Sequence, residues 1–223
     1  MAMPLLLAGT SWATRPEPLP TAANVERLTA LDGREAYPSI SPDGVAVVFA
    51  NRGSGHWDIY TQRRLDEPPR NPTAGSRVDD TQPSFSRDGR WIAFRSERDG
   101  GGIFVMDADG TKVRKLCARG FHPVWSPDGC QIAYAGFLRM RATEYLRRSQ
   151  IEVLDVSSGQ QRAVTSEDVL YDGAQPVWSP DGQWLAFWGT DKLGVTYVYT
   201  ALAGGKSVPV KVVRGGPVKS VQG

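Results

Sequence analysis

The sequence predicts an all-β fold, a β-propeller of four-stranded antiparallel blades. Three observations support this prediction: one unit of sequence occurs four times, its spacing is nearly regular, and each copy has the pattern of a β-hairpin. The glycines that end the four turns, Gly44, Gly89, Gly129 and Gly182, are 45, 40 and 53 residues apart. A unit repeated at such a period is typical of propellers and solenoids.

Each copy places a tight turn between two short apolar runs. In the fourth copy, residues 176–182 (Pro-Val-Trp-Ser-Pro-Asp-Gly) lead into Leu185-Ala186-Phe187. Proline fixes φ, aspartate bonds its own backbone and glycine adopts positive φ, so the run forms a turn. Arg87 replaces the proline once, which a type I turn tolerates. A carboxylate found in every repeat is therefore expected to form turns rather than to catalyse. The expected turn residues are Ser41, Pro42, Asp43, Gly44, Ser86, Asp88, Gly89, Ser126, Pro127, Asp128, Gly129, Ser179, Pro180, Asp181 and Gly182.

Two further strands are expected in each repeat, which gives the four strands of one blade. The third strands are expected at residues 58–61, 102–105, 150–153 and 197–200. The outer strands are expected at residues 70–73, 115–117 and 163–165. Pro72 weakens the first of these as a ladder strand. The blades are thus predicted at about 36–73, 80–117, 121–165 and 173–213 of a propeller domain that spans 23–223.

Residues 1–22 are expected to lie outside the propeller. A short apolar run at 4–8 and small residues at 11 and 13 precede a proline-rich linker at 14–22. The apolar run is too short to cross a bilayer. A weak or clipped signal peptide, the remnant of a membrane anchor and a disordered leader all remain open, and the first two are favoured.

Both ends of the repeat region indicate an incomplete ring. Residues 25–29 are predicted to form an outer strand that has no preceding blade. Residues 217–223 align with 176–182, so a fifth repeat is expected to begin at 216–223. An arc of a larger ring explains both features, and a closed four-bladed propeller with frayed ends is the alternative. An open arc would leave apolar blade faces uncovered and favour self-association.

Composition excludes several classes of function. The chain of 223 residues is long enough for one all-β domain, and its 24 glycines and 16 prolines suit many tight turns. A net charge of +2 with mixed signs provides no field that would attract nucleic acid or an anionic membrane. Cys117 and Cys130 are too few for a disulfide framework. They form either one bridge or, as favoured here, two free and partly buried thiols.

The repeated unit resembles the repeats of the TolB-like β-propellers. The resemblance rests on Pro-x-Trp/Phe-Ser-Pro-Asp-Gly-x-x-Ile-Ala-Phe and on the following Asp/Gly-Ile-Tyr/Phe-Val strand, and it covers nearly all of residues 25–223. Arg87, the weak first outer strand and the degenerate last copy depart from the pattern. The resemblance implies a six-bladed ring, a periplasmic location and binding of proteins such as the lipoprotein Pal and colicins. TolB also has an N-terminal α/β domain that residues 1–22 cannot supply, so membership of the Tol system does not carry over.

The sequence carries no pattern typical of an enzyme or of a cofactor site. It has neither a Gly-x-Ser-x-Gly elbow nor a phosphate-binding Gly-x-x-x-x-Gly-Lys loop. Its two histidines, His56 and His122, lie outside any metal-ligand pattern. Residues 107–110 (Asp-Ala-Asp-Gly) lack the downstream glutamate of a calcium loop and are expected to form a hairpin turn. No enzyme activity, metal or cofactor is expected.

Two sets of residues are candidates for an interaction surface. One set immediately precedes the repeat prolines and is expected around the channel mouth, where our hypothesis is a polar rim that contacts a ligand or partner peptide: Tyr37, Gln82, His122 and Gln175. Ordinary exposed residues at the entry to the strands are the alternative. The other set lies in an insert that lengthens the third repeat and consists of Arg139, Arg141, Arg147 and Arg148. Such an insert could hold an acidic partner or be a solvated loop.

The sequence therefore favours a non-catalytic protein-interaction or sensor module. The resemblance implies a place in the bacterial cell envelope, periplasmic or otherwise extracytoplasmic, with a membrane tether through an N-terminal segment as an option. The partner is expected to be a protein and not a nucleic acid. Because similar propellers gate prolyl-oligopeptidase-type serine peptidases, the substrate-gating portion of a larger enzyme is the alternative.

Overall fold

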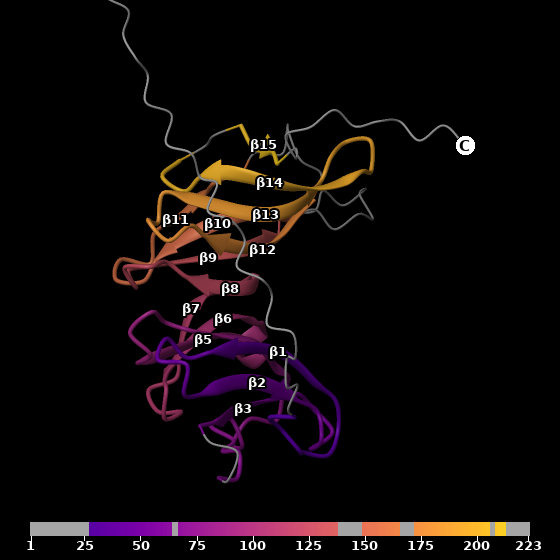
Figure 1. The fold of residues 1–223 in the computed structure, drawn as a ribbon, viewed down its shortest axis with the longest axis vertical. Helices are drawn as coiled ribbons and strands as arrows, with labels where there is room; N and C mark the ends of the chain where they lie inside the picture. Colours follow the sequence, from indigo (N-terminus) through magenta and orange to yellow (C-terminus); the bar gives the residue numbers. More distant parts are fainter. Residues whose placement is uncertain (1–26, 64–66, 138–148, 166–171, 206–207, 213–223) are drawn as a thin grey trace, which may run out of the picture. The chain divides into compact units, whose positions relative to one another are not determined.

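The computed structural model describes residues 27–63, 67–137, 149–165, 172–205 and 208–212. From Leu31 onward these residues belong to one compact unit of four antiparallel sheets (Figure 1). The all-β propeller prediction is confirmed, with each sheet as one blade. The outer strand expected at 25–29 is absent over Arg27–Thr29, the part of it that the structure describes, because a strand without a neighbouring edge has no hydrogen-bond ladder to hold it. The repeat expected at 216–223 lies outside the described residues.

The first two blades contain seven strands. Those of blade 1, in the order β1-β2-β3, are β1 (Glu35–Ile40), β2 (Val47–Asn51) and β3 (Asp58–Gln62). Those of blade 2, in the order β4-β5-β6-β7, are β4 (Asp80–Phe85), β5 (Trp91–Ser96), β6 (Gly102–Asp107) and β7 (Arg114–Cys117). A short 3-10 turn, Arg98–Gly100, joins β5 to β6.

The last two blades have four strands each. Those of blade 3, in spatial order β11-β10-β9-β8, are β8 (Phe121–Trp125), β9 (Gln131–Phe137), β10 (Ser149–Asp155) and β11 (Gln161–Ala163). Those of blade 4, in the order β12-β13-β14-β15, are β12 (Asp172–Trp178), β13 (Trp184–Thr190), β14 (Thr196–Leu202) and β15 (Val210–Lys211). The basic insert would join β9 to β10, but its four arginines lie outside the described residues.

Blade 1 differs from the prediction in having three strands. Its expected outer strand is reduced to a single bridge, in which Thr61 and Arg70 exchange backbone hydrogen bonds of 2.8 Å. Pro69 precedes Arg70 and Pro72 follows Asn71. Because proline has no N–H to donate, the ladder cannot extend in either direction.

The four repeat turns share one hydrogen-bond pattern. In the third turn the Asp128 carboxylate accepts bonds from the Ser126 hydroxyl and from the Cys130 N–H, the latter at 2.9 Å. The Ser126 hydroxyl oxygen in turn accepts the N–H of Gln131 at 2.9 Å. The same bonds recur around Asp43, Asp88 and Asp181. The turn aspartates therefore hold the hairpins closed.

These bonds predict a loss of stability in acid. Hydrogen bonds from the turn serines hold the pKa of Asp43, Asp88, Asp128 and Asp181 below the ordinary value of 3.8. A carboxyl whose pKa is lower in the folded state contributes stability above its unfolded pKa and loses it as the pH falls through the folded pKa. The free energy of unfolding should therefore fall as the pH drops from about 4 toward 2. Burial raises the pKa of Asp80. Asp80 therefore contributes to the pH dependence of the unfolding free energy in the opposite direction.

Denaturant unfolding at a series of pH values measures this effect. Asp181→Asn should make the free energy of unfolding less dependent on pH in this window, because one of the four turn carboxyls no longer titrates. A profile that stays flat from pH 4 to pH 2 would contradict the assigned turn bonds.

Blades pack face to face through alternate residues of their strands. We call the face toward the next blade the leading face and the face toward the preceding blade the trailing face. The leading faces of blades 1 to 3 present small and β-branched side chains, for example Ala50, Ile59, Ala93, Ile103, Ala133 and Ile151. The trailing faces of blades 2 to 4 place a large ring against them: Phe94, Tyr134 and Phe187. Each ring is at most 2% exposed, and burial of such a side chain contributes about 1.5–3 kcal/mol.

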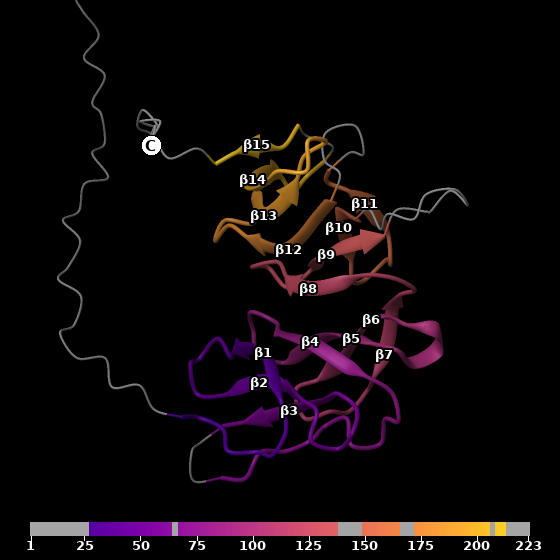
Figure 2. The same cartoon turned by 90° about the vertical axis from the view of Figure 1, so that its right-hand side faces the viewer.

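The first strand of each blade lies beside the first strand of the next. Contacts join β1 to β4, β4 to β8 and β8 to β12 (Figure 2). These four strands therefore form one continuous inner surface, on which the predicted rim residues lie. Among the described residues, no helix has the length and apolarity needed to cross a membrane.

Candidate functional site

The rim residues share an unusual backbone conformation. Tyr37, Gln82, His122 and Gln175 have φ of 57°, 55°, 52° and 50°, and each precedes a proline. At each of them the register between the inner strand and its neighbour shifts, as in a β-bulge, for example between Thr81 and Ser84. Positive φ is uncommon for residues other than glycine. Such a bulge turns a side chain out of the regular alternation of a strand, so all four side chains are redirected in the same way.

The structure brings three rim residues together. The Gln82 side-chain carbonyl, in blade 2, accepts the backbone N–H of His122, in blade 3, at 2.8 Å. The His122 ring lies edge-on to Tyr37 of blade 1, with 6.2 Å between ring centroids. Tyr37 also contacts the Trp57 ring at 6.3 Å. Side chains from three successive blades thus form one connected cluster.

Gln175 is held differently. Its side-chain carbonyl accepts the indole N–H of Trp188, from its own blade, at 2.9 Å. Gln175 therefore shares the bulge of the other three residues, but it is bound to β13 and not to their cluster.

The chemistry of the rim is hydrogen bonding and aromatic contact. Tyr37 is 41% exposed, Gln175 is exposed, and Gln82 and His122 are half-buried. Burial lowers the pKa of His122 below 6.5, which leaves its imidazole neutral at pH 7 with one donor and one acceptor nitrogen. A phenol, an imidazole and two carboxamides can exchange hydrogen bonds with the backbone of a polypeptide.

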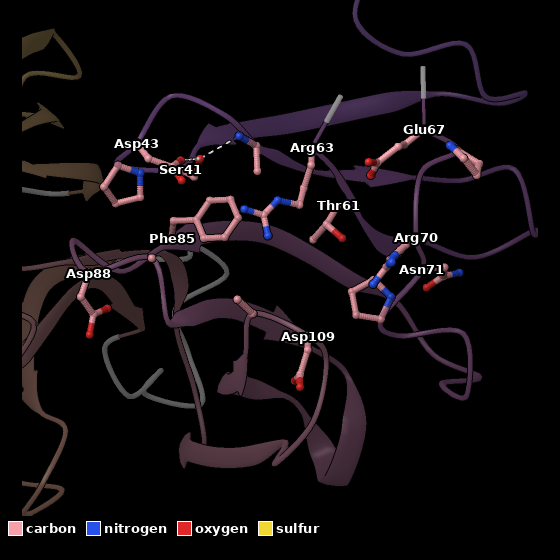
Figure 3. A pocket seen from close by; sticks show the side chains of 16 residues that line it. Ser41, Asp43, Thr61, Arg63, Glu67, Arg70, Asn71, Phe85, Asp88 and Asp109 are labelled. Atoms are coloured by element: carbon pink, nitrogen blue, oxygen red, sulfur yellow. Dashed lines mark hydrogen bonds between the residues drawn. The ribbon is translucent and has the colours of Figure 1, made fainter. Parts of the chain in front are cut away.

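A second concave feature lies between the turns of blades 1 and 2. This cleft of about 940 Å³ is lined by the turns of Asp43 and Asp88 and by Arg63, which extends into it near Phe85 (Figure 3). It is wide because the outer strand of blade 1 is reduced to the bridge at Arg70. This cleft is not among the sites predicted from the sequence, although the prolines at 68, 69 and 72 indicate that the outer strand is interrupted there.

Equivalent clefts between later blades are smaller, at about 320 and 450 Å³. In the last of them Arg162 spans the gap and donates to the carbonyl of Ala203 at 2.9 Å and to Gln131 at 2.9 Å. The clefts thus follow from the repeat geometry, and they differ in width and in the side chains that fill them.

The cysteines are free, which confirms the part of the favoured interpretation that concerns their pairing. Cys117 is buried, its thiol donates to the carbonyl of Arg119 at 2.9 Å, and burial raises its pKa. Cys130 is exposed rather than partly buried, because it follows the turn glycine directly. Within the described ranges, no three His, Cys, Asp or Glu side chains gather as metal ligands would. His56 lies 3.4 Å from the Asp58 carboxylate.

The family model of the TolB beta propeller domain matches residues 19–135. The chain belongs to this family. A relative from Bacillus subtilis (strain 168), described as uncharacterized peptidase YuxL, is 26% identical over 189 residues, which cover 67% of this chain and 28% of the relative. The uncharacterized protein Atu1656 of Agrobacterium fabrum is 27% identical over 184 residues, covering 76% of this chain and 59% of the relative. The chain therefore spans less than two thirds of either protein.

Solved TolB structures have the same fold. TolB from Acinetobacter baumannii superposes with a TM-score of 0.66 at 20% identity, over 80% of this chain and 44% of that one. At this identity the likeness establishes the blade architecture alone.

Proposed function

We propose that this TolB-family propeller is a non-catalytic protein-interaction or sensor module and that its rim contacts a protein partner. The observation that carries the proposal is the cluster at the inner strands, where Tyr37, Gln82 and His122 from three blades meet. Backbone strain at such positions costs on the order of 1–3 kcal/mol each. The strain redirects a phenol, an imidazole and two carboxamides, which can all bind peptide groups.

The expected partner is a protein segment that presents backbone amides and carbonyls to the rim. The carboxamide of Gln82 and the neutral imidazole of His122 can each donate and accept hydrogen bonds. The exposed ring of Tyr37 adds apolar contact area at a low cost in side-chain entropy. Recognition of this kind requires no metal or cofactor.

Changing the four rim residues to alanine tests the proposal. Affinity for an identified partner, measured by calorimetry, should fall at least about tenfold, because hot-spot side chains commonly contribute 2 kcal/mol or more. Lys112→Ala with Arg90→Ala, on the exposed turn side of blade 2, serves as the matched control and should leave affinity unchanged. Unchanged affinity in a folded rim variant would overturn the proposal.

The substrate-gating part of a larger peptidase is the second candidate. It is favoured by the relative YuxL, described as a peptidase, of which this chain covers 28%. A gating propeller would accompany a hydrolase domain with a nucleophile elbow in the same polypeptide. Labelling of the full-length natural protein by a fluorophosphonate probe would support this candidate, and absence of labelling would favour the interaction module.

The location and attachment of the protein are part of the same proposal. We place it in the cell envelope, outside the cytoplasm, with a membrane tether N-terminal to the propeller and with association between copies. Fractionation of cells that express the full-length protein tests the location, since recovery in the cytoplasm would contradict it.

A further inference from the structure

Trp57 adds a third aromatic ring to the rim. Its ring centroid lies 6.3 Å from that of Tyr37, which in turn lies 6.2 Å from the ring centroid of His122. The strand registers give Trp57 of blade 1 the place of Gly101 in blade 2 and of Ser149 in blade 3. Because those two residues are small, blade 1 alone of these three blades has an aromatic ring at this place.

The backbone of blade 2 holds Trp57 in position. The Trp57 N–H donates to the Asp79 carboxylate at 2.9 Å, and the Trp57 carbonyl accepts the N–H of Asp80 at 2.8 Å. Asp80 begins β4, the strand that carries Gln82 two residues later. The segment that positions Gln82 therefore also positions the half-buried Trp57, and such pre-organisation lowers the entropy cost of binding.

Hydrogen bonds within the protein use up the carboxamide acceptors of the rim and leave its donors. The side-chain carbonyl of Gln82 accepts the backbone N–H of His122, and that of Gln175 accepts an indole N–H of its own blade. Within the described part of the chain, the amide NH2 groups of Gln82 and Gln175 and the indole N–H of Trp57 donate to no acceptor. One ring nitrogen of His122 and the hydroxyl oxygen of Tyr37 remain as acceptors.

The charges beside the rim do not favour an anion. Arg95 places its guanidinium 3.9 Å from the ring centroid of Phe121, the residue before His122. This guanidinium already donates to the Gly120 carbonyl at 2.8 Å and pairs with the Glu97 carboxylate. A carboxylate ligand would lose its hydration without gaining this charge as a free partner, and that loss is costly. The donors of the rim therefore suit neutral acceptors such as amide carbonyls.

An ordinary peptide segment presents one backbone N–H for each carbonyl, and a buried N–H without an acceptor is destabilising. Proline has a carbonyl and no N–H. A proline-rich segment therefore presents acceptors and apolar rings together, and its polyproline II conformation exists before binding. Aromatic surfaces with hydrogen-bond donors are known to recognise such segments.

We propose that the rim, with Trp57 as a further specificity-determining residue, binds a proline-rich segment of the partner. This inference rests on the proposed function and names the chemical class of its partner. Carbonyls of the segment accept from the Trp57 indole N–H and the Gln82 amide, while pyrrolidine rings pack on the rings of Tyr37 and Trp57.

Fluorescence anisotropy of a labelled decaproline, titrated with the full chain, tests the inference. Wild-type protein should bind, and Trp57→Ala should weaken binding at least about tenfold. Trp57→Phe keeps a ring but removes the N–H, and it should weaken binding about fivefold. Trp184→Ala is the matched control, at a tryptophan that is 41% exposed beside the repeat turn of blade 4, and it should leave binding unchanged.

Two labelled peptides of the same length test the selection for segments without N–H groups and without charge. One alternates serine with alanine and the other glutamate with alanine, and each should bind at least about tenfold more weakly than decaproline. Equal or tighter binding of either peptide would overturn the inference. So would a wild-type chain that does not bind decaproline, or binding that folded Trp57→Phe and Tyr37→Ala variants leave unchanged. These two variants also decide if Trp57→Ala does not fold.

The outcomes separate this inference from the proposed function. If decaproline fails to bind but the fourfold rim variant still loses its natural partner, the proposed function stands and the proline-rich class is wrong. If the rim variant keeps its natural partner, the proposed function itself is overturned. Displacement of the natural partner by decaproline would support both.

Discussion

Phe94→Ala is expected to destabilise the propeller by about 3–5 kcal/mol, the range for removal of a large aromatic side chain from a packed core. Phe94 lies at the centre of the contact between blades 1 and 2 and is 0% exposed. Its ring lies 6.0 Å from that of Phe104 on the same face. The substitution would leave a cavity between the sheets of blades 1 and 2. Neither sheet can fill this cavity unless the whole sheet moves.

Chemical denaturation followed by tryptophan fluorescence measures this effect. Val45→Ala, at a turn site that is 50% exposed, is the control and should change the free energy of unfolding by less than about 0.5 kcal/mol. An equally small effect of Phe94→Ala would mean that the sheets do not pack through this face.

Gly102→Ala should be nearly as damaging, at about 3 kcal/mol or more, because two costs add. Gly102 begins β6 with φ of 144°, and an added Cβ would lie 2.0 Å from the carbonyl oxygen of Cys117. That oxygen belongs to the backbone of β7, so relief requires the two strands to separate.

Gly75→Ala provides the comparison, since Gly75 has no positive φ and nothing within 4 Å of an added Cβ. Its effect should be within about 0.5 kcal/mol of zero. Equal melting temperatures of the two alanine variants would contradict the close approach of β6 to β7 at Gly102.

The parts of the fold that depend on local chemistry could be predicted from the sequence. Each serine-aspartate-glycine turn closes through bonds that span at most five residues, as at Ser126 and Asp128. The weakness of the first outer strand was also visible, since prolines remove donors wherever they occur. The expected strand at 25–29 was wrong over its described part, because the pattern of a strand does not supply the neighbouring strand that its hydrogen bonds need.

Features that depend on distant residues could not be derived in this way. The positions of the rim residues followed from the repeat, but their positive φ and the contact of Tyr37 with His122 depend on how three blades pack. The same holds for the cleft near Arg63 and for the place of Trp57 beside Tyr37. Alternation identifies the residues of a face, but only the packing of the blades decides which of them meet.

Site-specific photocrosslinking tests most directly whether the rim is the surface that meets a partner. In cells that contain the natural partners, a photoreactive amino acid would replace Gln82 or Tyr37, at the rim, or Arg87, in the exposed turn of blade 2. We expect a discrete adduct with one protein from position 82, the same adduct from position 37, and none from position 87. Adducts from position 87 alone, with none from the rim, would contradict it.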